Sequence, residues 1–172
     1  MEFSQGLYRL DADGNDMEFL SSTSNNTWGL GFSEEFDVFI STANNTHSGF
    51  YGLPKKLLDA APNKETGIDK IDNHYAMHVV TKNLRQVDVF GGFTAAAGHN
   101  LYTARNFPKE YWNRIAFVCE PTGRLIHKHI LQQQGAGFKE SGDGWNLLAS
   151  ADEWMGPIQA EVGPDGAVWV AD

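Results

Sequence analysis

Apolar residues in this chain come in short runs that are interrupted by glycine, proline, aspartate and asparagine. The pattern is clearest in residues 152–172, where a short apolar run, the sequence Gly163-Pro164-Asp165-Gly166 and the run Val168-Trp169-Val170 follow one another. Proline fixes φ at the second turn position, and glycine accepts the positive φ that a side chain opposes. This pattern predicts a β-hairpin. Since one hairpin cannot cover its own edges, it favours a larger β structure.

Two patterns of strand and turn occur twice. Residues 32–42 repeat the apolar strand, acidic turn and apolar strand of residues 162–172, and residues 8–14 repeat the strand, acidic turn and glycine of residues 117–123. Such repeats are typical of propellers, in which four-stranded antiparallel blades stack around a channel. At roughly 40 to 50 residues a blade, a single domain over residues 1–172 would hold about three to four blades. We therefore expect an all-β fold, a partial β-propeller.

Two polar segments are interpreted as connections. Residues 52–73 contain at most one short helical turn and then a polar stretch, which indicates a long excursion between strands. Residues 11–18 gather acidic side chains as a calcium loop does, but they lack the glycine and glutamate spacing of that loop. We expect a hairpin turn there.

Composition excludes several classes of function. With 172 residues, of which 41% are hydrophobic, the chain suits one domain with its own core. A net charge of −9 argues against nucleic acid or an anionic membrane as a partner. No run approaches the roughly 18 apolar residues of a transmembrane helix, and residues 1–6 lack the features of a signal peptide. If the chain is a fragment, the missing signal peptide carries no information.

Longer stretches resemble a known family. Residues 98–113, 117–123 and 150–154, together with the ending from Gly163 to Asp172, resemble bacterial membrane-bound dehydrogenase propeller proteins. These are related to the soluble quinoprotein glucose and sorbosone dehydrogenases, and many carry a haem c domain. The resemblance implies a six-bladed propeller, exported to the periplasm or secreted. Cys119 is the only cysteine, so this chain has no C-x-x-C-H haem motif, and it resembles the middle of such a protein.

The resemblance implies candidate residues for a quinone-dependent oxidation. That reaction needs a base, cations for the carboxylates of pyrroloquinoline quinone, and often calcium. His47 lies after the apolar strand 38–42, and His99 follows Gly98 in a small-residue run, so both are candidate catalytic bases. Taken alone, each histidine is better interpreted as a partly exposed, hydrogen-bonded loop residue. Arg105 is the candidate cation for the cofactor. Other members of the family draw cations from blades around the whole ring, so a complete cofactor site is not expected here.

The remaining histidines and the tryptophans receive structural interpretations. His74 and His78 have the spacing of a helical metal pair, but their segment favours β structure. His127 and His129 share one face of a strand, and we expect them on the solvated edge of a hairpin. The tryptophans could stack on sugars, but they pack blades together more often. We expect Trp154 and Trp169 to form a core pair.

Two functions follow from these observations. In the first, the whole protein oxidises a sugar or alcohol and passes electrons to a haem c domain that this chain lacks. Its partners would then be that domain and the remaining propeller blades. In the second, the chain is a non-catalytic propeller module that binds carbohydrate or a protein.

The first function predicts turnover in the full-length parent protein. With pyrroloquinoline quinone, calcium, an artificial acceptor and a panel of sugars, we expect acceptor reduction, and His47→Ala or His99→Ala should each lower its rate by about tenfold or more. Absence of both turnover and quinone binding would reject the enzyme hypothesis. Unchanged rates in both correctly folded variants would reject the two histidines as bases.

Overall fold

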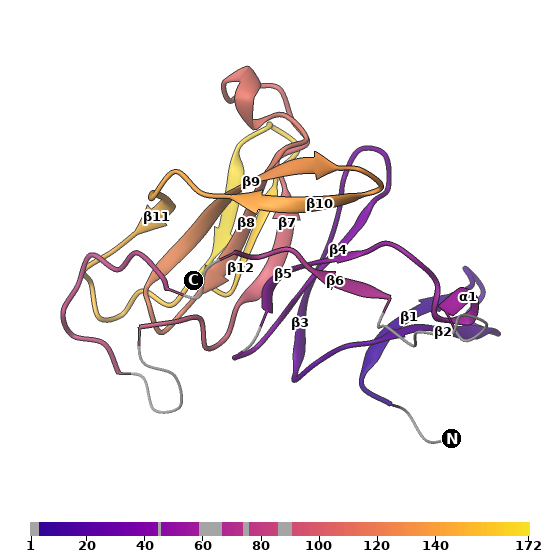
Figure 1. The fold of residues 1–172 in the computed structure, drawn as a ribbon. Coiled ribbons are helices and arrows are strands. Elements are labelled where there is room, and N and C mark those ends of the chain that lie inside the picture. The colour runs from indigo at the N-terminus through magenta and orange to yellow at the C-terminus, as the bar shows by residue number, and fades with distance from the viewer. Residues whose placement is uncertain (1–3, 45, 59–66, 74–75, 86–90) are drawn as a thin grey trace.

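The computed structural model describes residues 4–44, 46–58, 67–73, 76–85 and 91–172. It confirms the all-β fold, which consists of antiparallel sheets with very little helix. The sheets lie next to one another across the molecule, from the β1–β2 hairpin at one end to β11 at the other (Figure 1). No helix in the described ranges is long and apolar enough to cross a membrane.

The first large sheet contains four strands in chain order, so each strand pairs with the next one along the sequence. Such a meander is the arrangement within a propeller blade. Its strands are β3 (Thr27–Phe32), β4 (Val38–Thr42), β5 (Thr46–Tyr51) and β6 (Ile68–Lys70). The helical turn expected between residues 52 and 73 is confirmed as α1 (Lys55–Leu58), while residues 59–66 of that excursion lie outside the described ranges.

The second large sheet repeats this order. Its fourth position is divided, because β10 and β11 pair with successive parts of the long strand β9. A short 3-10 helix, η1 (Lys109–Tyr111), lies in the connection between the first two strands. The strands are β7 (Ala97–Leu101), β8 (Ile115–Glu120), β9 (Leu125–Gln134), β10 (Gly137–Ser141) and β11 (Asn146–Ala149).

One hairpin stands before the two large sheets and another follows them. The turn between the strands of the first, at residues 11–16, is confirmed by the backbone bonds Asp11 N to Asp16 O, 3.1 Å, and Gly14 N to Asp11 O, 3.1 Å. The strands of the final hairpin pair as the terminal sequence predicts. The strands are β1 (Gly6–Leu10), β2 (Met17–Ser22), β12 (Gln159–Val162) and β13 (Val168–Ala171).

The repeat between residues 32–42 and 162–172 is confirmed down to the register. Phe32 pairs with Val38, and the equivalent Val162 pairs with Val168. The backbone bonds from Ser33 N to Asp37 O (3.0 Å) and from Gly163 N to Ala167 O (2.8 Å) also correspond. Both turns use a positive φ at the same place, +65° at Phe36 and +77° at Gly166. The two hairpins are therefore copies of one backbone design.

The second repeat is correct in outline but shifted by one residue. Both segments run from a strand through a tight turn into a second strand. In residues 8–14, the residue with positive φ is Gly14, at +71°. In residues 117–123 the equivalent glycine, Gly123, is followed by Arg124, which adopts the positive φ of +56°. Gly123 instead makes room for Met77, whose sulfur would lie 2.5 Å from an added Cβ.

The first strand of each large sheet packs against the first strand of the group that follows it: β3 packs against β7, and β7 packs against β12 of the final hairpin. We call the contact between the β3–β6 sheet and the β7–β11 sheet the seam. Successive residues of β3 face alternately toward the seam and away from it. Gly29 and Gly31 face β7 so closely that an added Cβ on Gly31 would lie 1.9 Å from the His99 carbonyl oxygen. Only glycine permits this approach.

Buried apolar side chains from both large sheets fill the seam, and this joint core holds the sheets together. A second cluster lies between the β7–β11 sheet and the final hairpin and includes Cys119, whose thiol pKa is raised to about 12 by burial. The cluster that spans the seam consists of Phe39, Phe50, Ile71, Leu101, Ala116 and Leu131.

The expected core pair Trp154 and Trp169 is wrong. These side chains are 93% and 59% exposed. Trp169 lies against the turn of its own hairpin, with its indole N–H donating to Asp165 Oδ1 at 3.0 Å, and Gly163 leaves space for the ring. A local turn contact therefore replaces the predicted packing between blades.

The opposite face of β3 is apolar and open to solvent. Trp28, Leu30 and Phe32 are 61%, 47% and 47% exposed, while the glycines between them face the seam. Monomeric proteins rarely expose such a continuous apolar strip.

The close approach at Gly31 gives a stability prediction. Gly31→Ala should lower the free energy of unfolding by about 2 kcal/mol or more, because the methyl group must push β3 and β7 apart. Chemical denaturation of both proteins measures this difference. Gly142→Ala is the matched control, since its Cβ would meet nothing within 4 Å. Equal stability of the two variants would show that β3 does not approach β7 so closely.

The open face of β3 predicts self-association of the chain when it is expressed alone. Sedimentation over a range of concentrations should show dimers or larger species, and Leu30→Lys should shift the protein toward monomer. Phe36→Lys changes an 81% exposed side chain in the adjacent turn and serves as the control. A wild-type chain that remains monomeric at all concentrations would contradict the prediction.

Candidate metal centre

Four potential metal ligands meet inside the seam. His47 is the second residue of β5, His127 and His129 lie on β9, and Glu140 lies on β10. All four are between 0% and 2% exposed, and one ligand atom from each lies within 4.8 Å of the others. The first sheet supplies one of these side chains and the second sheet supplies three.

Strand pairing explains why these polar residues are buried. β9 is not an edge, because β8 pairs with it on one side and β10 and β11 on the other. Alternation along β9 therefore directs His127 and His129 to the seam. Lys128, between them, donates to Asp143 Oδ2 at 2.7 Å on the other face. The expected solvated position of the two histidines is wrong for this reason.

Glu140 is the centre of the cluster. Its two carboxylate oxygens lie 2.8 Å from His47 Nε2 and 3.1 Å from His127 Nε2. The ring centroids of His47 and His127 are 5.0 Å apart, and those of His127 and His129 are 5.3 Å apart. Three imidazoles and a carboxylate are ligands that zinc and related transition metals accept.

A second carboxylate lies behind His47. Asp72 Oδ2 is 3.4 Å from His47 Nδ1, and the Asp72 side chain is 1% exposed. Lys70 Nζ lies 3.6 Å from the same oxygen. Burial raises the pKa of Asp72, while the nearby His47 and Lys70 oppose that rise. A carboxylate behind a ligating histidine is a common second layer of metal sites, because it fixes the orientation of the ring.

Ser48 connects the cluster to His99. Its hydroxyl oxygen lies 3.0 Å from His99 Nε2 and 3.2 Å from His129 Nε2. Burial lowers the pKa of His99 to about 3 and that of His129 well below its usual value. Both rings are therefore neutral at physiological pH. Phe39 stacks on His99 with the ring planes 6° apart, which holds this ring in place.

The charges of the cluster suit a divalent cation. Glu140 and Asp72 are buried carboxylates, whereas His99 and His129 contribute no positive charge. Buried charges are stable only when they are paired or bound to a metal. A divalent ion bound by the three histidines and Glu140 would add positive charge beside both carboxylates, of which Asp72 also has Lys70 Nζ 3.6 Å away.

Comparison with known proteins places the whole chain in one family. A family model, described as a domain of unknown function, DUF7133, matches residues 1–172. The chain belongs to the DUF7133 family. No curated protein and no solved structure matches this DUF7133 chain.

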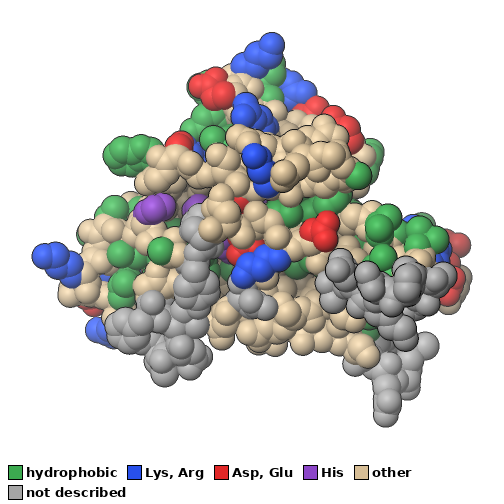
Figure 2. Space-filling model, in the orientation of Figure 1, with side chains coloured by type: hydrophobic (Ala, Val, Ile, Leu, Met, Phe, Trp, Pro, Cys, Tyr) green, Lys and Arg blue, Asp and Glu red, His purple; other side chains and the backbone are tan. Residues whose placement is uncertain are grey.

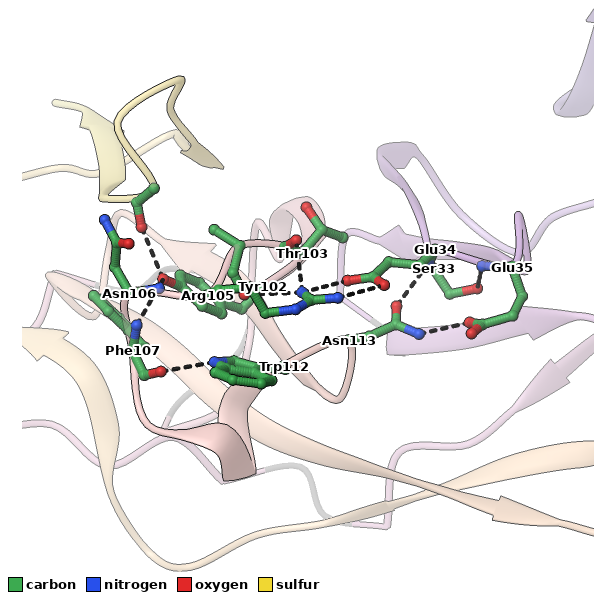
Figure 3. A network of polar contacts seen from close by, with 12 residues as sticks. Ser33, Glu34, Glu35, Tyr102, Thr103, Arg105, Asn106, Phe107, Trp112 and Asn113 are labelled. Carbon is green, nitrogen blue, oxygen red and sulfur yellow. Dashed lines mark hydrogen bonds and ion pairs between the residues drawn. The ribbon is translucent and has the colours of Figure 1, made fainter.

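The structure brings together two of the three site residues expected from the sequence. His47 is in the cluster, and His99 reaches it through Ser48. Arg105 belongs to a different network. Its guanidinium makes two parallel bonds to Glu34, at 2.7 and 2.8 Å, and lies 5.1 Å from the centre of the Trp112 ring (Figure 3). Glu34 thus occupies the face of Arg105 that would hold an anionic cofactor.

Sequence reasoning missed Glu140 and misplaced the two histidines of β9. The signal that was available is the pair His127 and His129 at alternate positions of one strand, which indicates a shared face. Nothing local marks Glu140 as their partner. Of the other histidine pair considered, His74 lies outside the described residues, and His78 is exposed and outside the cluster.

Proposed function

We propose that this DUF7133 chain is part of a β-propeller in which a divalent metal ion joins two neighbouring blades. Three features support the propeller. The two large sheets are meanders of the same order, the β3–β4 and β12–β13 hairpins share a turn design, and the first strands pack in sequence. The β3–β6 and β7–β11 sheets would be two blades, with β12–β13 beginning the next.

The single observation that carries the metal assignment is the buried set His47, His127, His129 and Glu140. Zinc binds histidine and carboxylate at about 2.0 to 2.2 Å, which places tetrahedral ligands about 3.4 Å apart. The ligand atoms, which lie within 4.8 Å of one another, would need to move closer by up to about 1.4 Å. Side-chain rotation on β5 and β9 can supply such a movement. We therefore propose Zn²⁺ as the bound ion.

The proposed role of the ion is structural. Catalytic zinc sites keep a position open for water or substrate, whereas structural sites are closed by four protein ligands. Here all four ligands are buried, and they come from both sheets. Metal binding would therefore oppose separation of the sheets and couple to folding. Asp72 would orient His47, and Ser48 would orient His129.

The oxidoreductase function implied by the resemblance stays a hypothesis for the whole protein. Within this chain, metal binding suits His47 better than proton abstraction from a substrate, and His99 contacts the cluster through Ser48. Their side chains are 2% and 0% exposed, so neither reaches a sugar at the described surface. A general base must lie within hydrogen-bond reach of the proton that it takes.

Metal analysis tests the proposal. The purified chain should hold one zinc ion per molecule by plasma mass spectrometry. Removing it with a chelator should lower the melting temperature by about 10 °C, since a thousandfold excess over Kd adds about 4 kcal/mol and each kcal/mol shifts a domain of this size by about 2 to 4 °C. Re-addition of Zn²⁺ should restore the melting temperature.

Two variants separate metal binding from folding. Glu140→Gln preserves the shape of the side chain but removes its charge, and we expect it to abolish the zinc-dependent rise in melting temperature. His78→Ala, at an exposed histidine outside the cluster, should bind zinc as the wild type does. If the wild-type chain holds no metal and melts identically with zinc and with chelator, the cluster is a metal-free hydrogen-bond network and the proposal is wrong.

A further inference from the structure

A second site, independent of the metal centre, lies at one end of the seam. It is a cleft of about 610 Å³, within the range of small-molecule sites. Three connections form its walls: the β3–β4 turn, the β7–β8 connection and the β9–β10 hairpin. Its floor is apolar and consists of the buried side chains Phe39, Leu101 and Leu131.

The cleft brings together opposite charges that are not paired with each other. Asp37 and Glu35 line it from the β3–β4 turn, and Arg114 lines it from the β7–β8 connection. The Arg114 guanidinium makes no hydrogen bond or ion pair with any described residue. Among the described residues, no cation pairs with Asp37 or Glu35 either.

Beside the cleft, Glu34 and Arg105 form a complete ion pair. These two residues come from the same two connections and bond each other at both oxygens (Figure 3). Asn113 fixes the rim beside them, because its side chain accepts from Glu34 N at 2.7 Å and donates to Glu35 Oε2 at 2.5 Å. The amide of Asn113 thus holds Glu35 and the adjacent Arg114 at one rim, which leaves one Glu35 oxygen and the guanidinium for a ligand.

The carboxylates of Asp37 and Glu35 can accept further hydrogen bonds from a ligand. Asp37 Oδ2 accepts from the Ser33 hydroxyl at 3.0 Å, so Asp37 Oδ1 is available to a donor in the cleft. Gln132 and Gln133 line the opposite wall and make no side-chain hydrogen bond within the described structure. On the face of the molecule that Figure 2 shows, acidic and basic side chains are interspersed. The cleft is distinct because its unpaired charges of both signs surround an apolar floor.

We propose that this cleft binds a free α-amino acid with an apolar side chain. Arg114 would hold the carboxylate of the ligand, because a guanidinium matches a carboxylate with two parallel bonds. Asp37 and Glu35 would accept from its ammonium group. The apolar side chain would cover Phe39, Leu101 and Leu131. A ligand with only one charge would leave the opposite group of the cleft unpaired, which costs affinity.

Ligands that lack one charge test this assignment. Titration of the whole chain by calorimetry should show binding of L-leucine and at least about tenfold weaker binding of leucinamide, which lacks the carboxylate, and of 4-methylpentanoate, which lacks the ammonium group. Arg114→Gln should weaken leucine binding by about tenfold but leave leucinamide unchanged. Asp37→Asn should weaken leucine binding and leave 4-methylpentanoate unchanged.

Lys139→Gln is the matched control, since this exposed residue lies on β10 but does not line the cleft, and it should bind leucine as the wild type does. The assignment is overturned if no apolar amino acid shows binding at ligand concentrations up to about 10 mM. It is also overturned if glucose binds the wild type and Arg114→Gln equally well, because the cleft would then recognise hydroxyl groups. Chelation of zinc should not change leucine binding, so failure of the metal proposal and failure of this one give different results.

Discussion

The close approach of β3 to β7 positions every other feature of the two large sheets. It depends on glycine, because a side chain on Gly31 would overlap the His99 carbonyl group. Once the backbones are this near, the apolar side chains of both sheets can share one core. The polar residues of β5 and β9 are then enclosed between the sheets, away from water.

Enclosure changes the chemistry of those residues. An exposed histidine titrates near neutrality, whereas His99 and His129 are held neutral by burial. Glu140 and Asp72 share His47, which lies between them, and Asp72 also has Lys70 Nζ 3.6 Å away. A divalent metal bound by Glu140 would add positive charge beside these buried carboxylates, among the neutral rings of His99 and His129. The metal proposal therefore follows from the same packing that buries the cluster.

The outer end of the seam is organised by a different set of contacts. Glu34, Arg105 and Asn113 connect the β3–β6 sheet to the β7–β11 sheet (Figure 3). The Tyr102 hydroxyl donates to the Gly166 carbonyl at 2.8 Å, which connects the β7–β11 sheet to the final hairpin. Successive hairpin turns are thus joined at one end of the stack. The cleft lies beside this network. Asp37 and Arg114 take no part in it, and Glu35 contributes one carboxylate oxygen to Asn113. The structural contacts and the groups proposed to bind a ligand therefore lie on the same connections.

Local sequence determined the strands and turns of this protein. A turn such as residues 163–166 depends on the φ preferences of its own residues, so its copy at residues 33–37 could be recognised without the fold. The positions of the candidate ligands depended on tertiary structure. His47 and Glu140 are 93 residues apart, and whether β9 is an edge depends on the pairing of β10 and β11. Trp154 and Trp169 failed as a core pair for the same reason: hydrophobicity predicts a tendency to be buried, but only the neighbouring sheet decides which face is covered.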